Sequence, residues 1–340
     1  MLITVLIVLI LTFLASLAFY AARNQEQEEL TDSVRTKAPG GFVRLPDGFV
    51  HYELAGPADG ETVVLVHGFS TYFFTWDPTF QALVHAGFRV LRYDLYGRGY
   101  SDRPAVVYNK DLFDRQLLGL LAVLDIRDRV DLIGNSMGGL ITTTFAARHP
   151  EKVRTLTLIA PAFFFLERVP FPLGIPLAGD YAGRVFAVPF IARAQIKDFK
   201  HPERFSDYDR TYRLQMRYKG FSRAIMSTIK NLPYWDALSS LKRVSKTDIP
   251  VLLLWGRADR TIPLAASERV RAVAPCADFH VIGLLEDINR FSNCVTLAAP
   301  EGLEPPTLGS EDQCSIQLSY GAANCSGVLR AARASARSAR

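Results

Sequence analysis

Short apolar runs alternate with segments of helical periodicity along most of the chain. Six runs have the length and content of buried strands: Thr62–Val66, Phe88–Tyr93, Val130–Gly134, Val153–Ile159, Pro250–Trp255 and Asp278–Ile282. Four segments carry apolar residues at helical spacing: Trp76–Ala86, Asp111–Leu124, Met137–Arg148 and Leu264–Val273. Upstream, Phe42–Leu45 and Phe49–Leu54 flank an Asp-Gly turn and predict a hairpin. Because strands that alternate with helices form parallel sheets, the pattern predicts an α/β fold with a mostly parallel sheet flanked by helices.

The alternation stops between residues 161 and 247. This interval is rich in Phe, Tyr and Pro, and helical patterns lie near Arg213–Lys230. A structureless loop of that length is rare in a compact domain. The sequence therefore predicts an inserted, mainly helical cap at 161–247, which divides the core into residues 41–160 and 248–283.

The first 22 residues, Met1 to Ala22, contain no charged side chain. A helix of this length covers roughly 33 Å, enough to cross the hydrocarbon core of a membrane. We predict an uncleaved anchor; the alternative is a signal peptide of a secreted protein, which would lack the usual basic start but has a candidate cleavage site at 15–18. Arg23, Arg35 and Lys37 follow the helix, so the positive-inside rule favours a cytoplasmic body. Residues 23–40 are read as a linker.

Composition and charge narrow the class of protein. The formal net charge is +5, but Arg330, Arg333, Arg337 and Arg340 lie in the last eleven residues, and without them the charge is +1. A nearly neutral body argues against nucleic-acid binding. All four cysteines, Cys276, Cys294, Cys314 and Cys325, lie near the C-terminus at spacings typical of neither zinc nor redox motifs. No metal or organic cofactor is implied.

The candidate chemistry begins at Gly134-Asn135-Ser136-Met137-Gly138. This G-x-S-x-G segment follows a predicted strand and opens a predicted helix, which is the context of a nucleophile elbow. Ser136 is the predicted nucleophile of an acyl-transfer reaction. Such a reaction needs two donors aimed at the developing oxyanion. The backbone amides of Met137 and of Phe69, in the loop His67-Gly68-Phe69-Ser70, are the candidates.

Asp259 is the candidate third member of a triad. It follows the late strand Pro250–Trp255, where a carboxylate could orient an imidazole; the alternative is a capping or surface role. His67 is the first residue of the loop that carries Phe69 and is interpreted as a structural residue that braces this loop rather than as the base.

These pieces together resemble the α/β-hydrolase family from about Phe42 to Ile282. The motifs that carry the resemblance are HGFS, DLYGRGYSDRP, GNSMGG and WGRADRTIP. The apolar N-terminus and HGFS are similar to membrane-bound monoacylglycerol lipases and related carboxylesterases, which implies a serine hydrolase of carboxylic esters. The elbow is also similar to that of carbon–carbon hydrolases acting on ring-cleavage products. Those enzymes usually have a loop rich in Gly and Pro after the pair that corresponds to His67-Gly68, whereas bulky residues follow it here. A noncatalytic, lipid-binding relative is the remaining alternative. Aromatic residues of the cap favour an apolar acyl group: Phe163, Phe164, Phe165, Phe171, Phe186 and Phe190.

One expected residue is missing. The resemblance implies a catalytic histidine shortly after the final strand, yet no histidine follows His280, and Glu286 and Asp287 occupy the expected place. His280 is itself read as a strand residue, and His51, His85, His149 and His201 are poorly placed. The composition also changes here, so residues 284–340 are predicted to be an atypical, disordered tail. Our hypothesis is a frameshift or a misjudged gene end, and this chain is then impaired as an enzyme.

Overall fold

The computed structural model describes residues 1–197 and 207–283. Its eight strands form one sheet in the order β1-β2-β4-β3-β5-β6-β7-β8. The strands are β1 (Gly41–Leu45), β2 (Gly48–Ala55), β3 (Thr62–Val66), β4 (Arg89–Tyr93), β5 (Val130–Asn135), β6 (Val153–Ile159), β7 (Val251–Gly256) and β8 (Asp278–Ile282). β1 and β2 form the predicted hairpin, β2 is antiparallel to β4, and every pair from β4 to β8 is parallel. The mostly parallel sheet is confirmed.

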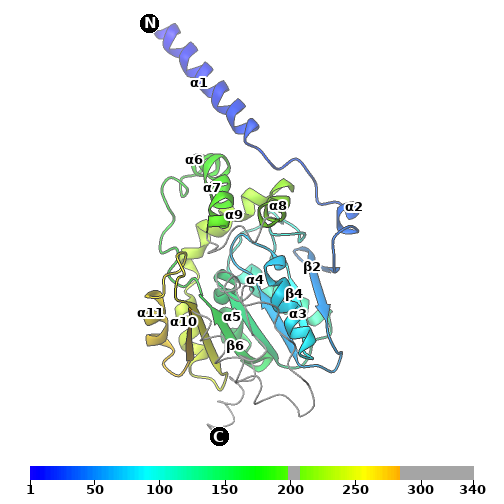
Figure 1. Ribbon diagram of the computed structural model, residues 1–340. Helices are drawn as coiled ribbons and strands as arrows, with labels where there is room; N and C mark the ends of the chain where they lie inside the picture. The colour runs from blue at the N-terminus through cyan, green and yellow to red at the C-terminus, as the bar shows by residue number, and fades with distance from the viewer. Residues whose placement is uncertain (198–206, 284–340) are drawn as a thin grey trace.

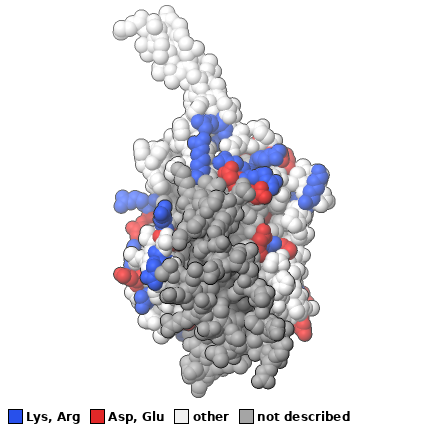
Figure 2. Space-filling model, viewed as in Figure 1, with Lys and Arg blue, Asp and Glu red and all other residues white. Residues whose placement is uncertain are grey.

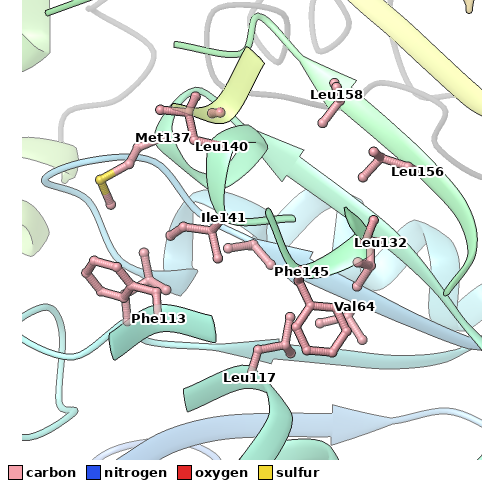
Figure 3. Close-up of a cluster of buried hydrophobic side chains, with 14 of the residues drawn as sticks. Val64, Phe113, Leu117, Leu132, Met137, Leu140, Ile141, Phe145, Leu156 and Leu158 are labelled. Carbon is pink, nitrogen blue, oxygen red and sulfur yellow. The ribbon is translucent and has the colours of Figure 1, made fainter. Parts of the chain in front are cut away.

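Helices cover both faces of this sheet (Figure 1). On one face lie α4 (Lys110–Val123), α5 (Met137–Arg148), α10 (Ala237–Val244) and α11 (Ala266–Val273). On the other lies α3 (Asp77–His85), preceded by the 3-10 turn η1 (Phe73–Trp76). Successive residues of β3 point to opposite faces: Val64 and Val66 enter the first core, whereas Val63 and Leu65 enter the second. Figure 3 shows the first core, where Phe113 and Leu117 of α4 meet Ile141 and Phe145 of α5.

The predicted bounds hold closely. The strands at 62–66, 153–159 and 278–282 and the helix at 137–148 have the predicted limits, and the other core elements end within two residues of theirs. The start of α3 moves to Asp77 because the residues before it form the tighter turn η1, and Pro78 occupies the first turn of the helix, where its missing amide costs nothing.

The cap contains α6 (Ala178–Ala182), the π-helical η3 (Gly183–Ala187), α7 (Val188–Lys197), α8 (Tyr208–Leu214), η5 (Gln215–Arg217), α9 (Phe221–Asn231) and η6 (Leu232–Tyr234). These helices share a core of their own, which includes Tyr212, Phe221 and Ile225. The cap is shorter than the predicted range 161–247, because α10 packs on α5 and buries Leu241 and Val244 in the core under the sheet. The tail predicted at 284–340 lies outside the described residues.

The N-terminal helix α1 (Leu2–Ala22) projects from the body, and none of its residues is buried (Figure 1). Among the described helices it alone is long and apolar enough to cross a membrane, a property that signal sequences share. The segment after it, predicted as a linker, is held against the body. The backbone of Glu28 forms an isolated parallel β-bridge with Tyr218. The carboxylate of Glu26 accepts hydrogen bonds from the amides of Gly220 at 2.7 Å and Ser222 at 2.6 Å. This segment also includes α2 (Asp32–Arg35), whose Arg35 pairs with Asp102 at 2.6 Å.

Candidate active site

Ser136 lies in the sharp turn between β5 and α5. Its backbone has φ 53° and ψ −118°, a conformation that residues with a side chain rarely adopt. Three backbone hydrogen bonds hold it there: Ser136 donates to the carbonyl of Ile159 at 2.9 Å, and its own carbonyl accepts from Gly139 at 3.0 Å and Ala162 at 3.1 Å. Within the described residues the half-buried Ser136 hydroxyl has no hydrogen-bond partner. The turn therefore presents a free alcohol at the carboxyl ends of the parallel strands.

The two glycines of the elbow are required by close backbone approaches. A Cβ on Gly134 would lie 2.4 Å from the carbonyl oxygen of Gly138, and one on Gly138 would lie 2.2 Å from that of Val66. Such distances are far inside van der Waals contact. The G-x-S-x-G spacing thus follows from how tightly α5 packs on the ends of β3 and β5.

The loop after β3 lies beside the serine. A Cβ on Gly68 would lie 3.5 Å from the Cβ and 3.9 Å from the Oγ of Ser136. The next residue in the loop is Phe69, and its amide has no acceptor among the described residues. Met137 is the first residue of α5, where an amide lacks a partner within the helix. The structure thus brings both predicted oxyanion donors to the neighbourhood of Ser136.

A buried arginine fixes the position of this loop. The Nε of Arg98 donates to the carbonyl of Phe69 at 2.8 Å, and its two terminal nitrogens donate to the carbonyl of Tyr96 and to the hydroxyl of Thr228 in the cap. Burial lowers the pKa of Arg98 to about 10, which still leaves it charged at neutral pH. Arg98 therefore joins the candidate oxyanion loop to both the core and the cap.

His67 is fully buried and is used structurally, as predicted. Its Nδ1 lies 2.9 Å from the carbonyl oxygen of Gly68, and its Nε2 accepts from the amide of Leu95 at 3.0 Å. This arrangement requires the neutral ring with the proton on Nδ1. Burial lowers the pKa of His67 from 6.5 to about 4. Both nitrogens are occupied, so the ring cannot act on Ser136.

The neutral state of His67 predicts a pH dependence of stability. Because its pKa is lower in the folded chain, the unfolded chain binds the proton more tightly, and the folded state should lose about 3 kcal/mol as the pH falls from about 6.5 to about 4. Urea unfolding across this range would measure the effect. His67→Gln should flatten the dependence in this window, whereas His85→Gln, on the exposed end of α3, should leave it unchanged. Equal slopes in all three proteins would contradict the assignment.

Asp259 follows β7, at the same edge of the sheet as Ser136. Because β5, β6 and β7 are adjacent and parallel, the two residues stand two strands apart, about 10 Å between the strand ends. Asp259 Oδ1 accepts from the amides of Thr261 at 2.9 Å and Ile262 at 2.8 Å. Burial raises its pKa, and these two hydrogen bonds oppose the shift. One oxygen of Asp259, Oδ1, therefore has the capping role that was the alternative to a place in the triad. The other oxygen, Oδ2, has no partner among the described residues.

No described imidazole fills the space between Ser136 and Asp259. His51 contacts Asp94 and the carbonyl of Pro39, His85 contacts the carbonyl of Gln81, and His149 lies near Asp114. His280 projects from β8 and pairs with Asp278 at 3.0 Å. His201, Glu286 and Asp287 lie outside the described residues. The described part of the chain also contains no cluster of His, Cys, Asp and Glu suited to a metal.

Sequence reasoning missed the role of Asp94, the first residue of the motif DLYGRGYSDRP. This fully buried carboxylate accepts from the amides of Phe73 at 2.9 Å and Tyr100 at 2.8 Å and contacts His51 Nδ1 at 2.7 Å. Burial alone would raise the pKa of Asp94, but His51 and the amide of Phe73 lower it below its usual value. A Cβ on Gly99, whose φ is +50°, would overlap the carboxylate of Asp94. The aspartate followed by a glycine five positions later was therefore the sequence signal that could have indicated this role.

Known proteins share the fold of this chain. Residues 61–284 match a family model described as alpha/beta hydrolase fold. A 2-hydroxy-6-oxononadienedioate/2-hydroxy-6-oxononatrienedioate hydrolase of Paraburkholderia phymatum is 30% identical, over 75% of this chain and 92% of the relative. A 2-hydroxy-6-oxo-2,4-heptadienoate hydrolase of Pseudomonas putida is 31% identical, over 69% and 86%. The crystal structure of an enol-lactonase from Burkholderia xenovorans superposes with a TM-score of 0.61 at 22% identity, over 75% and 98%. The chain therefore belongs to the α/β-hydrolase fold family.

Proposed function

We propose that Ser136 is the nucleophile of a hydrolase that acts on a carbonyl carbon through an acyl-enzyme. The free hydroxyl of Ser136 and the strained turn that presents it support this proposal. Ser136 Oγ attacks the carbonyl, and the amides of Phe69 and Met137 stabilise the oxyanion. The leaving group takes a proton as the acyl–oxygen bond forms, and water then releases the acid.

Each step needs a base that takes the proton from Ser136 or from the attacking water. Asp259 would orient this base. Oδ2 of Asp259 is available for this contact, because Oδ1 already holds the turn at 261–262. The five described histidines are all engaged elsewhere. A carboxylate is a weak substitute, since its pKa near 4 matches poorly with an alcohol. We therefore propose that this chain turns over slowly, because none of the described imidazoles is free to serve Ser136.

The first candidate substrate is a vinylogous diketone whose carbon–carbon bond is hydrolysed. The single observation that carries it is the likeness to two hydrolases of oxo-dienoate compounds at 30–31% identity over at least 86% of their lengths. The side chains around Ser136 further restrict the acyl part of the proposed substrate. Phe69 follows Gly68, which lies beside Ser136, and Phe163 follows Ala162, whose amide donates to the carbonyl of Ser136. The three nitrogens of Arg98 are all bound within the protein. We therefore propose an acyl part without a second carboxylate.

The second candidate is a carboxylic ester with an apolar acyl group. The same aromatic surroundings favour it, because they offer apolar contact to an acyl chain, and the nitrogens of Arg98 are already bound within the protein. The apolar helix α1 favours it too, since esters of fatty acids partition into membranes.

A two-substrate comparison separates the candidates. We expect this chain to hydrolyse 2-hydroxy-6-oxohepta-2,4-dienoate with a kcat/KM at least about 100-fold above that for p-nitrophenyl butyrate. The ratio is informative even if turnover is slow, because a missing base should slow both reactions. Loss of dienoate absorbance and release of nitrophenolate provide the two rates. Ser136→Ala serves as the blank for each substrate, and a preference for the ester would replace the first candidate by the second.

We also propose that α1 anchors the chain in a membrane. Its 21 residues give a helix of about 32 Å, which matches the hydrocarbon core. Phe19 and Tyr20 lie in the last turn and Arg23 follows directly, an order typical of the membrane–water interface. The cations that follow the helix favour a cytoplasmic body by the positive-inside rule.

A further inference from the structure

The cap helices α6 and α7 lie on the side of the body from which α1 projects (Figure 1), and the cap exposes large apolar side chains. We call this set the cap face: Phe165, Phe171, Ile175, Leu177, Phe186 and Phe190. Phe171 is 86% exposed, Leu177 84% and Phe190 70%. Large apolar side chains exposed in number over one short stretch of chain are typical of interaction surfaces.

The cap face touches the end of the N-terminal helix. The rings of Phe19 and Phe186 lie 6.3 Å apart between centroids, and Tyr20 stacks on Tyr181 at 5.6 Å. The hydroxyl of Tyr181 donates to the carbonyl of Ser16 at 3.3 Å. These contacts fix the level of the cap relative to α1.

The level matters because Phe19 and Tyr20 occupy the last turn of the proposed membrane span. A helix that starts at Leu2 and rises 1.5 Å per residue reaches the far boundary of the hydrocarbon near these two residues. Phe186, in contact with Phe19, is then at the depth of the headgroups and the first acyl carbons. Of the other cap-face residues, Phe190 lies in α7 and the rest lie in the loop before α6.

Cations adjoin the cap face where α1 leaves the body. A cavity of about 280 Å³ is lined by Asn24, Glu26, Arg184, Lys219, Gly220 and Arg223, which we call the basic pocket. The basic pocket holds three cations and one acid, Glu26, which accepts from the amides of Gly220 and Ser222 and lies 3.9 Å from Arg184. Lys219 also pairs with Glu29 at 2.7 Å, so the cations of the basic pocket are only partly neutralised. Arg184 also lies over the ring of Tyr20 at 5.1 Å. Figure 2 shows Lys and Arg gathered at the base of the uncharged helix.

We propose that the cap face docks onto the surface of the bilayer that α1 spans, with the basic pocket facing its anionic headgroups. Apolar side chains flanked by cations are the combination that favours an interfacial position. The inference rests on the proposed anchor and is independent of the proposed catalysis.

Bromine-labelled lipids test the insertion of the cap face. The native residues Trp76, Trp235 and Trp255 are buried, so a single added tryptophan reports on its own surroundings. We expect Phe171→Trp and Phe190→Trp, in the full chain reconstituted in phosphatidylcholine–phosphatidylserine vesicles, to lose about half of the added emission when the acyl chains carry bromine, because interfacial side chains lie roughly 5–10 Å deep. Val123→Trp, at an exposed apolar position at the end of α4, should lose none.

A reporter in α1 separates the two proposals. Leu14→Trp should be quenched whenever the helix spans the bilayer. If Leu14→Trp is quenched while the two cap reporters behave like Val123→Trp, the docking of the cap face is overturned and the anchor stands. Association of two copies through the cap face would produce this same result. If Leu14→Trp is not quenched, both proposals fail.

The role of the basic pocket is tested by removing charge. Arg184→Gln combined with Lys219→Gln should reduce the quenching of Phe171→Trp in vesicles that contain phosphatidylserine and leave it unchanged in pure phosphatidylcholine. The matched control, Arg127→Gln combined with Lys246→Gln, removes two exposed cations away from α1 and should change neither value. Equal quenching before and after the pocket substitutions in both lipids would overturn the headgroup contact.

Discussion

Replacing Ser136 by alanine is expected to abolish covalent labelling of this chain by a fluorophosphonate. The reagent reacts with an alcohol that is exposed, oriented and flanked by oxyanion donors, and Ser136 combines a free hydroxyl with the nearby Phe69 and Met137 amides. Labelling of the unsubstituted chain should be slow because no described imidazole is free to act on Ser136, and Ser136→Ala should lower it further by at least about 100-fold. Gel fluorescence over time gives both rates.

The fold provides the control for this substitution. Ser136→Ala removes a hydroxyl that makes no hydrogen bond with described residues, so the urea midpoint should stay unchanged. Ser136→Gly should instead be more stable than Ser136→Ala by about 1 kcal/mol, because glycine tolerates the φ of 53°. Persistent labelling of a folded Ser136→Ala protein would show that another group reacts and would remove the basis for the proposed mechanism.

The sheet and the elbow were predictable because they depend on local rules. A continuous apolar run such as Thr62–Val66 can be buried on both faces only in a covered parallel sheet, and it forms β3 with these bounds. Gly134 and Gly138 mark a point where backbone approaches leave no room for a Cβ. Strand order follows from such patterns only loosely, yet parallel strands place their carboxyl ends at one edge, which is why Ser136 and Asp259 share it.

The remaining features depend on contacts between distant segments. The polar residues at 24–40 indicate a free linker, but Glu26 finds unpaired amides at the start of α9, 194 positions away. Similarly, α10 continues the cap in sequence, whereas Leu241 and Val244 bury their side chains against α5. Asp94 appeared in the sequence only as one letter of a motif, and its partner His51 comes from the hairpin. Periodicity within a segment contains no information about such partners.

Replacing Gly138 by alanine should prevent stable folding of the chain. The new methyl group would lie 2.2 Å from the carbonyl oxygen of Val66 and 2.7 Å from that of His67, and both belong to backbone at the end of the central strand β3. Neither atom can rotate away as a side chain would, so α5 must shift off the sheet and open the core around Ile141 and Phe145. We expect a loss of about 3 kcal/mol or more in the free energy of unfolding.

The matched control for Gly138→Ala is Gly68→Ala, because both glycines lie where β3 meets the elbow. A Cβ at residue 68 meets its nearest neighbour, the Cβ of Ser136, at 3.5 Å, which is ordinary contact, so Gly68→Ala should fold with a nearly unchanged urea midpoint. Its methyl group would nevertheless lie 3.9 Å from Ser136 Oγ, in the space that an attacked carbonyl needs, and should slow fluorophosphonate labelling. Equal stability of the two variants would show that α5 is not packed on β3 as described. Unimpaired labelling of Gly68→Ala would show that the reagent approaches Ser136 from another side, away from the Phe69 amide.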